Sequence, residues 1–161
     1  NNLKSIIDLG CGDFNVGKDI YNNVNKYYAF DIVPDLINTN KKKFNDKKII
    51  FKCSNFIDDI LPKADCVILR QVLQHLDNKS ITKVLEKIKS YKYVIITEHI
   101  PNNFFVPNID KNIGPTTRLE FNSGINIEIH PFNFNFISKN EIKLEDKELG
   151  GVHRTVIYKL N

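Results

Sequence analysis

Short apolar runs alternate with helix-like segments through the first hundred residues, and this alternation constrains the fold more than any other feature of the sequence. The runs are rich in Ile, Val, Tyr and Phe, which favours buried strands. Strands are predicted at residues 5–9, 26–31, 48–53, 65–69 and 91–97. Strands that alternate with helices are typical of a parallel sheet covered on both faces. The sequence therefore predicts an α/β domain.

Three helices are predicted between these strands. The first spans residues 17–24, and the second runs from Pro34 to about Asn40, with proline suited to a first helical turn. The third is clearly amphipathic and is predicted to be capped by Ser80. Its apolar face carries Ile81, Val84, Leu85 and Ile88.

The pattern changes after Glu98. Residues 101–138 contain much Pro, Asn and Phe with little helical period, and "HPFNFNF" at 130–136 fits either a strand or an aromatic-lined loop. Two more strands are predicted at 141–144 and 154–160, with Gly150 and Gly151 between them. They favour an antiparallel pair at the end of the sheet.

Composition excludes several classes of protein. The chain has 161 residues, a net charge of +4 and three cysteines. The lysines at 41–48 are expected to form a solvated face. No stretch is apolar enough to span a bilayer, and no signal peptide is recognised. The cysteines are expected to be reduced interior thiols of a cytoplasmic protein, and the four histidines lack a close metal-ligand spacing, so no metal site is predicted.

The segment "IIDLGCGDF" at residues 6–14 places a glycine turn directly after the first strand. The first turn between a strand and a helix lies at the ligand-binding edge of such sheets. Asp31 ends the second strand, 19 residues after Gly12. A carboxylate at this distance from the glycines accepts hydrogen bonds from ribose hydroxyls. Together these features predict a nucleoside site.

A dinucleotide fits this turn poorly. The dinucleotide pattern needs a third glycine where this chain has Asn15. Asp8, Asp13 and Asp31 surround the predicted site with negative charge, which opposes a pyrophosphate. A ligand with a ribose and a net positive charge suits these residues better.

"IIDLGCGDF", "YYAFDIV" and "ADCVILRQVLQHL" together resemble the class I, Rossmann-like S-adenosylmethionine-dependent methyltransferases. The resemblance implies a doubly wound, mostly parallel sheet of seven strands and S-adenosylmethionine as cofactor, with S-adenosylhomocysteine as product. It implies that the glycine turn passes beneath the cofactor and that Asp31 holds its ribose. The cofactor-binding residues implied are Asp8, Gly10, Cys11, Gly12, Asp31, Ile32, Asn55, Phe56, Arg70 and Gln71.

Among these residues, Asn55 occupies the position where the family often has an acid that hydrogen-bonds the adenine amino group. Arg70 and Gln71 match the positions that bind the methionine end of the cofactor. A weaker resemblance, through "LRQVLQHL", "HPFNFNF" and "DKELG", links the chain to uncharacterised bacterial members. The family usually carries helices before its first strand, whereas only four residues precede the predicted first strand in this sequence. Two alternatives are left open: the helices have been removed, or the cofactor site is unusually open. One domain, 1–161, is expected: a cofactor-binding half at 1–100, an aromatic substrate or lid segment at 101–138 and closing strands at 139–161.

Candidate catalytic residues follow the fourth and fifth strands. His75 is the leading candidate for a general base, with a structural histidine as the alternative, because imidazole accepts protons near neutral pH. Glu98 and His99 are further candidates. Arg118 and His130, in the aromatic segment, are candidate substrate contacts.

The function predicted is methyl transfer to a small-molecule acceptor, such as a hydroxyl of a sugar or of an acidic metabolite. Neither nucleic acid nor membrane is expected as a partner, and the oligomeric state is left open. A nucleic-acid methyltransferase is an alternative, although "RQV" stands where such enzymes carry an Asn/Asp-Pro-Pro-aromatic motif. A noncatalytic module that binds the cofactor and an NAD-binding domain are the remaining alternatives.

Overall fold

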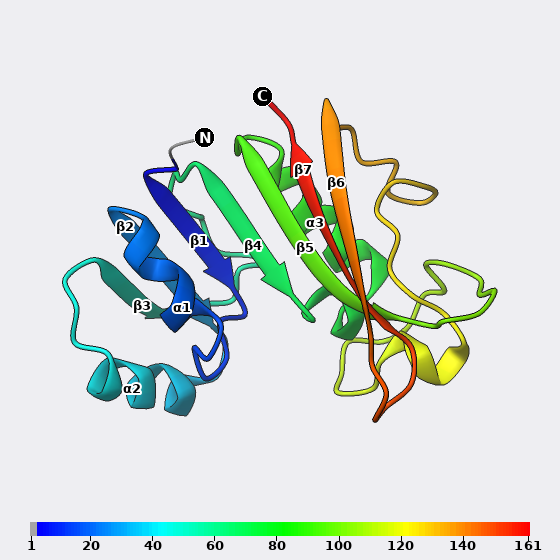
Figure 1. The fold of residues 1–161 in the computed structure, drawn as a ribbon, viewed down its shortest axis with the longest axis horizontal. Coiled ribbons are helices and arrows are strands. Elements are labelled where there is room, and N and C mark those ends of the chain that lie inside the picture. Colours follow the sequence, from blue (N-terminus) through cyan, green and yellow to red (C-terminus); the bar gives the residue numbers. More distant parts are fainter. Residues whose placement is uncertain (1–2) are drawn as a thin grey trace.

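The computed structural model describes residues 3–161, which form one seven-stranded sheet (Figure 1). Its strand order is β3-β2-β1-β4-β5-β7-β6. The strands are β1 (Ser5–Leu9), β2 (Lys26–Asp31), β3 (Ile49–Cys53), β4 (Cys66–Arg70), β5 (Tyr93–Ile100), β6 (Ser138–Glu145) and β7 (Val152–Lys159). The first five are parallel to one another, whereas β7 is antiparallel to both β5 and β6. The predicted fold class, with its C-terminal antiparallel pair, is confirmed.

Helices lie on both faces of the sheet (Figure 1). One face is covered by α1 (Gly17–Ile20), which continues into a 3₁₀ turn at Tyr21–Asn23, and by α2 (Pro34–Lys43). The other face is covered by α3 (Asn78–Ile88). No helix in the part of the chain described, residues 3–161, is long and apolar enough to cross a membrane.

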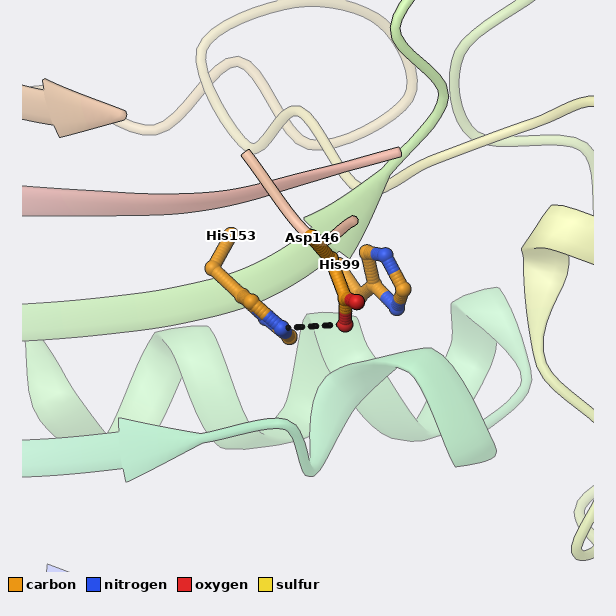
Figure 2. Close-up of side chains that lie close together, drawn as sticks. All are labelled: His99, Asp146 and His153. Carbon is orange, nitrogen blue, oxygen red and sulfur yellow. Dashed lines mark hydrogen bonds and ion pairs between the residues drawn. The ribbon is translucent and has the colours of Figure 1, made fainter. Parts of the chain in front are cut away.

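The antiparallel pairing of β5 with β7 aligns residues that are far apart in the sequence. His99 of β5 lies directly opposite His153 of β7 (Figure 2). Thr97 lies opposite Thr155 in the same ladder. The imidazole rings of the two histidines are stacked, with centroids 4.5 Å apart. The turn between β6 and β7 then brings Asp146 beside His153. Pairing of two strands that are far apart in the sequence therefore creates a polar cluster beside the β6–β7 turn.

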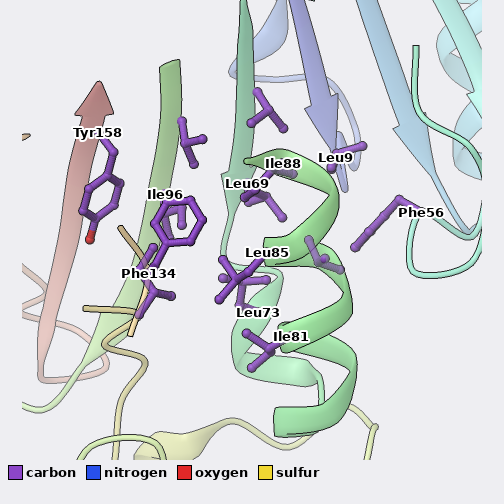
Figure 3. Packing of buried hydrophobic residues seen from close by; sticks show 14 of the residues in the cluster. Leu9, Phe56, Leu69, Leu73, Ile81, Leu85, Ile88, Ile96, Phe134 and Tyr158 are labelled. Atoms are coloured by element: carbon purple, nitrogen blue, oxygen red, sulfur yellow. The ribbon is translucent and has the colours of Figure 1, made fainter. Parts of the chain in front are cut away.

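The larger core lies between α3 and the central strands (Figure 3). The predicted apolar face of α3 is buried: Ile81, Val84, Leu85 and Ile88 are all at most 3% exposed. Full burial of such side chains contributes about 1.5–3 kcal/mol each. Beyond α3, Phe134 packs against Tyr158 of β7, with ring centroids 6.1 Å apart. Part of the aromatic segment thus covers the sheet beside α3.

Residues 101–137 cross from β5 to β6 with a single 3₁₀ turn, at Arg118–Phe121. Asn108 holds much of this crossover together, because its side chain donates to the carbonyls of Asn126 and His130 and accepts from the Asn126 amide. "HPFNFNF" is therefore a loop, and the alternative of a strand at these residues is wrong. We call residues 101–137 the crossover segment.

Two details differ from the sequence-based expectations. The cap of α3 is Asp77, because its carboxylate accepts a 2.7 Å hydrogen bond from the amide of Ser80. Ser80 itself lies inside the first turn. Cys11 and Cys66 are buried free thiols as predicted, but Cys53, the last residue of the edge strand β3, is exposed.

Candidate active site

A pocket of about 640 Å³ opens at the carboxyl ends of the first four parallel strands. This volume lies within the range of about 300–1,000 Å³ that small-molecule sites occupy. The pocket is lined by Gly10, Gly12, Asp31, Ile32, Asn55, Phe56, Ile57, Arg70, Gln71, Val72, His75, Leu76, Ile113 and Gly114. Eight of the residues predicted to bind the cofactor, and the predicted base His75, therefore surround one cavity.

The glycine turn after β1 forms the floor between β1 and β2. Gly10 and Gly12 have φ angles of 81° and 54°, in the left-handed region that favours glycine. The amides of Gly10 and Cys11 both donate to the Phe30 carbonyl, at 2.8 and 3.0 Å. A Cβ atom at Gly12 would meet no atom within 4 Å, so a ligand can approach the backbone closely at this position.

Gly17 has a different role from the two glycines of the turn. A Cβ atom there would lie 2.2 Å from the Phe14 ring. Phe14 is fully buried and packs edge-on against Tyr27, Phe44 and Phe51. Glycine at position 17 is therefore required by core packing.

Asp31 lies at the end of β2 with both carboxylate oxygens engaged by the backbone. Oδ2 accepts from the Gly12 amide at 2.9 Å, and Oδ1 accepts from the Val33 amide at 3.0 Å. The side chain is 8% exposed and lines the pocket. A carboxylate has about four lone-pair sites, so each oxygen retains capacity for a further donor. The backbone thus fixes the carboxylate while leaving it able to accept bonds from a ligand.

One wall of the pocket is apolar. Ile32 follows Asp31 and is 61% exposed, which leaves its side chain free to pack against a ligand. Phe56 and Ile57 follow β3, and Phe56 is also part of the larger core. Asn55 uses its amide locally, donating to Asp58 and accepting from the Ile57 amide. These residues form an apolar wall of the pocket that also carries the Asn55 amide.

The opposite wall follows β4. Gln71 has a φ of 56° and donates its backbone amide to Thr97 at 2.7 Å. Its side-chain nitrogen lies 3.1 Å from Nδ1 of His153. Arg70, the last residue of β4, supplies the positive charge of the pocket.

His75 lies in the 3₁₀ turn Leu73–His75, which we call the His75 turn. Nδ1 of His75 is buried and has no hydrogen-bond partner among residues 3–161. The carboxylate of Glu98 accepts from the amides of Leu73 and Gln74, at 2.9 and 3.1 Å. Burial raises the pKa of Glu98 to about 8, and these backbone bonds oppose the shift. Glu98 therefore holds the turn and does not line the pocket.

Arg118 holds the same turn from the other side. Its guanidinium is 1% exposed and donates to the carbonyls of Leu73, Gln74 and Ile109 and to the side chain of Asn78. These bonds link the His75 turn to the crossover segment through the Arg118 guanidinium. His130 is exposed and lies outside the pocket lining.

Asp8 and Cys11 also lie outside the pocket lining. Asp8 accepts a 3.0 Å hydrogen bond from the Tyr27 hydroxyl inside the smaller core. Desolvation raises the pKa of Asp8 from 3.8 to about 6, and the Tyr27 bond and the charge of Arg70 partly oppose this shift. Burial likewise raises the pKa of the Cys11 thiol. Both side chains support the glycine turn from within.

Sequence reasoning missed five lining residues: Ile57, Val72, Leu76, Ile113 and Gly114. Three of them adjoin predicted residues and could have been found by extending the motifs after β3 and β4. Ile113 and Gly114 carry no sequence signal, because they reach the pocket only through the crossover segment. The Gly114 amide donates to the carbonyl of His75 at 3.1 Å, which fixes this contact.

Solved structures of methyltransferases have the same fold. The methyltransferase domain of bacterial CtHen1-CN is 19% identical, with a TM-score of 0.68, covering 99% of this chain and 91% of that one. Human N-acetylserotonin methyltransferase, solved in complex with SAM, is 20% identical, with a TM-score of 0.65, covering 99% and 48%. The N-methyltransferase NodS from Bradyrhizobium japonicum WM9, in complex with S-adenosyl-L-homocysteine, is 8% identical, with a TM-score of 0.73, covering 100% and 80%.

No curated protein matches the chain. The model of the O-methyltransferase domain family matches residues 1–99, which contain the glycine turn, Asp31 and the His75 turn. The resemblance to class I S-adenosylmethionine-dependent methyltransferases is therefore confirmed by both the family model and the fold. The chain belongs to the O-methyltransferase domain family.

Proposed function

We propose that this chain transfers the methyl group of S-adenosylmethionine to a hydroxyl of a small-molecule acceptor bound in the pocket after β1–β4. The observation that carries the proposal is the single cavity that holds the Gly10–Gly12 turn, Asp31 and His75 together. The family match supports methyl transfer to oxygen. The proposed acceptors are sugars and acidic metabolites that carry a hydroxyl group, because His75 in the pocket lining can take the proton of a hydroxyl.

The pocket fits S-adenosylmethionine part by part. Asp31 accepts from the ribose hydroxyls, because the backbone bonds to its oxygens leave lone pairs unused. Ile32 and Phe56 pack against the adenine, and Asn55 bonds its edge. Arg70 pairs with the carboxylate of the methionine end and Gln71 donates to it. Open space at Gly12 allows the ligand to lie against the backbone.

The cofactor, when bound, would supply a methyl group attached to a positively charged sulfur. The sulfur becomes a neutral thioether once the methyl group has been transferred. The residues of this chain then need to align the acceptor and to take its proton. His75 accepts the proton of the attacking hydroxyl as the oxygen–methyl bond forms, and it later releases that proton to solvent. Glu98 and Arg118 hold the His75 turn, so the imidazole stays oriented toward the cavity. Alignment itself supplies much of the acceleration.

Two measurements test the proposal. Calorimetry with S-adenosylhomocysteine, NAD and ATP is expected to show binding of S-adenosylhomocysteine, with the other two far weaker. Transfer of a radiolabelled methyl group is then followed over a panel of sugars, hydroxy acids and phenols, with transfer to a hydroxyl as the expected result. NAD binding as tight as that of S-adenosylhomocysteine contradicts the cofactor assignment. Tight cofactor binding with no transfer to any acceptor supports a noncatalytic module.

A further inference from the structure

The cluster at the β6–β7 turn combines two imidazoles and one carboxylate. One potential ligand atom from each of His99, Asp146 and His153 lies within 4.8 Å of the other two (Figure 2). The backbone fixes this arrangement, because His99 and His153 are directly opposed in the β5–β7 ladder. Opposed residues on antiparallel strands have Cβ atoms about 4.5–5.5 Å apart. The cluster therefore follows from the sheet register and not from a flexible loop alone.

The turn between β6 and β7 orients Asp146 within the cluster. Its Oδ1 accepts from the amides of Glu148 and Leu149, at 3.0 and 2.9 Å. Its Oδ2 is left to face Nε2 of His153 at 3.0 Å. One oxygen thus anchors the carboxylate to the turn, and the other is presented to the imidazoles.

His99 is held in a similar way. Its Nε2 donates to the carbonyl of Gly150 at 2.6 Å, which fixes the tautomer and leaves the lone pair on Nδ1. Metal-ligating histidines commonly donate their second nitrogen to a backbone carbonyl in this manner. Gly151 makes the close approach possible, because a Cβ atom there would lie 2.8 Å from Nε2 of His99. The ring is 6% exposed and well shielded.

We propose that His99, Asp146 and His153 bind a divalent transition-metal ion of the zinc type. Two imidazoles and one carboxylate form a donor set that suits such ions. Ligand atoms around a tetrahedral zinc lie about 3.3 Å apart, given metal–ligand distances of about 2.0–2.1 Å. Because the rings are stacked, His153 must turn about its side-chain bonds to close the remaining gap. Both His153 and Asp146 are partly exposed, so they have room to do so.

The ion is coupled to the pocket through Gln71. Ligation by Nε2 of His153 moves its proton to Nδ1, which then acts as a donor. The Gln71 side chain, whose nitrogen now lies 3.1 Å from Nδ1, must reverse its amide to present oxygen. Gln71 lines the pocket, so metal occupancy changes which of its two amide atoms is turned away from His153 and left for the pocket. The metal site itself stands independently of the proposed function.

Metal binding to the full chain tests the proposal. Protein treated with EDTA is titrated with Zn²⁺ by calorimetry and with Co²⁺ by visible absorption. A site with nitrogen and oxygen ligands gives a weak visible Co²⁺ band without the thiolate charge-transfer band expected if Cys53 were the ligand. One ion is expected per chain. Thermal unfolding of the same samples is expected to shift upward with metal, because only the folded chain assembles the three ligands.

Variants separate this site from others. Loss of one residue that hydrogen-bonds a metal ligand costs about 10–100-fold in metal affinity. Loss of a ligand itself, in His99→Gln, Asp146→Asn or His153→Gln, is therefore expected to cost about 100-fold or more. Gln71→Leu removes the partner of His153 and is expected to cost about 10–100-fold. Glu148→Gln removes one negative charge from the same turn, as Asp146→Asn does, but leaves the three ligands in place. His130→Gln removes an exposed histidine elsewhere. Both variants are expected to bind the metal as the wild type does.

Absence of stoichiometric Zn²⁺ and Co²⁺ binding by the wild type overturns the proposal. Unchanged affinity in the three ligand variants also overturns it. Circular dichroism shows whether each variant folds, and Asp146→Asn is the least disruptive because its Oδ1 still accepts from the turn amides. These outcomes are independent of methyl transfer, since calorimetry with S-adenosylhomocysteine measures the pocket separately.

Discussion

Glu98 and Arg118 both hydrogen-bond the backbone of one turn, Leu73–His75. The carboxylate of Glu98 accepts from the amides of Leu73 and Gln74, and the guanidinium of Arg118 donates to the carbonyls of the same two residues. Both side chains are at most 3% exposed. The turn that carries His75 is therefore fixed by a buried acid from β5 and a buried base from the crossover segment.

This arrangement predicts energetic coupling between Glu98 and Arg118. Glu98→Gln and Arg118→Lys each remove part of this hydrogen bonding to the turn. The free energy of unfolding is expected to fall by about 1–3 kcal/mol for each variant. In a double-mutant cycle the coupling energy is expected to be about 0.5–3 kcal/mol. Urea denaturation measures all four proteins. Strictly additive changes in the free energy of unfolding would contradict the coupling of Glu98 and Arg118 through this turn.

His75 is predicted to act on turnover and not on cofactor affinity. Once an acceptor is known, His75→Ala is expected to lower kcat by about 10²–10⁴-fold, because it removes the base from the pocket. Binding of S-adenosylhomocysteine is expected to stay within a few-fold of the wild type. His130→Ala, at an exposed histidine away from the pocket, is the matched control. Full turnover in His75→Ala would leave alignment as the main source of catalysis.

Asp31 is predicted to carry much of the cofactor affinity. Hydrogen bonds to a charged acceptor contribute about 1.5–3 kcal/mol each, so Asp31→Ala is expected to weaken S-adenosylhomocysteine binding by about ten- to a few-hundred-fold. The variant also loses the bonds from the Gly12 and Val33 amides, so its melting temperature is expected to fall. Calorimetry well below that temperature isolates the binding effect. The exposed Asp35→Ala is the control, and equal losses in both variants contradict the ribose assignment.

Substitutions at Gly12 and Gly17 are predicted to affect different properties, ligand binding at Gly12 and stability at Gly17. Gly12→Ala places a methyl group beside the open pocket at a φ of 54°, so it is expected to weaken S-adenosylhomocysteine binding. Gly17→Ala drives its methyl group into the Phe14 ring and is expected to lower the free energy of unfolding by about 1–3 kcal/mol. Calorimetry and urea denaturation on both variants separate the effects. The reverse pattern would show that the two glycines have exchanged roles.

Asp8 is predicted to make stability depend on pH. Its pKa is raised from 3.8 to about 6, so the folded state binds the proton more tightly than the unfolded state. The resulting stabilisation is complete below pH 3.8 and is lost as the pH rises through about 6. The difference corresponds to about 3 kcal/mol.

Asp8→Asn removes this titration while keeping an oxygen for the Tyr27 hydroxyl. Relative to wild type, the variant is expected to gain stability between pH 4 and pH 7.5, by up to about 3 kcal/mol. Urea denaturation at both pH values measures the change, with the exposed Asp35→Asn as control. A pH-independent difference between wild type and Asp8→Asn would falsify the assignment.

The sheet and the first half of the pocket could be predicted from sequence because both depend on local patterns. Apolar runs fix β1 and β2, and the glycine turn and Asp31 follow directly at their ends. Burial of Asp31 was less evident, since an acid at the end of a strand commonly faces solvent. The cap of α3 was missed because Asp77 and Ser80 both suit a helix start, and only the direction of the hydrogen bond decides between them.

Features that depend on strand pairing could not be predicted. The whole crossover segment and the whole of β6 separate His99 from His153 in the sequence, so their spacing gave no metal signal, yet the ladder places them opposite each other. From the sequence alone, Arg118 is interpreted as a contact to an acidic substrate. Only the folded crossover segment shows its guanidinium among backbone carbonyls. Ile113 and Gly114 were missed for the same reason.

Under the proposed function, the crossover segment has a consequence for how acceptor preference changes in evolution or by design. The residues proposed to bind the cofactor all precede position 77, whereas Ile113 and Gly114 of the pocket lining come from a separate insert between Ile100 and Ser138. Inserts of this kind can be exchanged without altering the strands that anchor them. A graft that keeps Asn108 and Arg118 preserves the loop and the His75 turn, so new acceptor selectivity can be installed while the cofactor machinery stays intact.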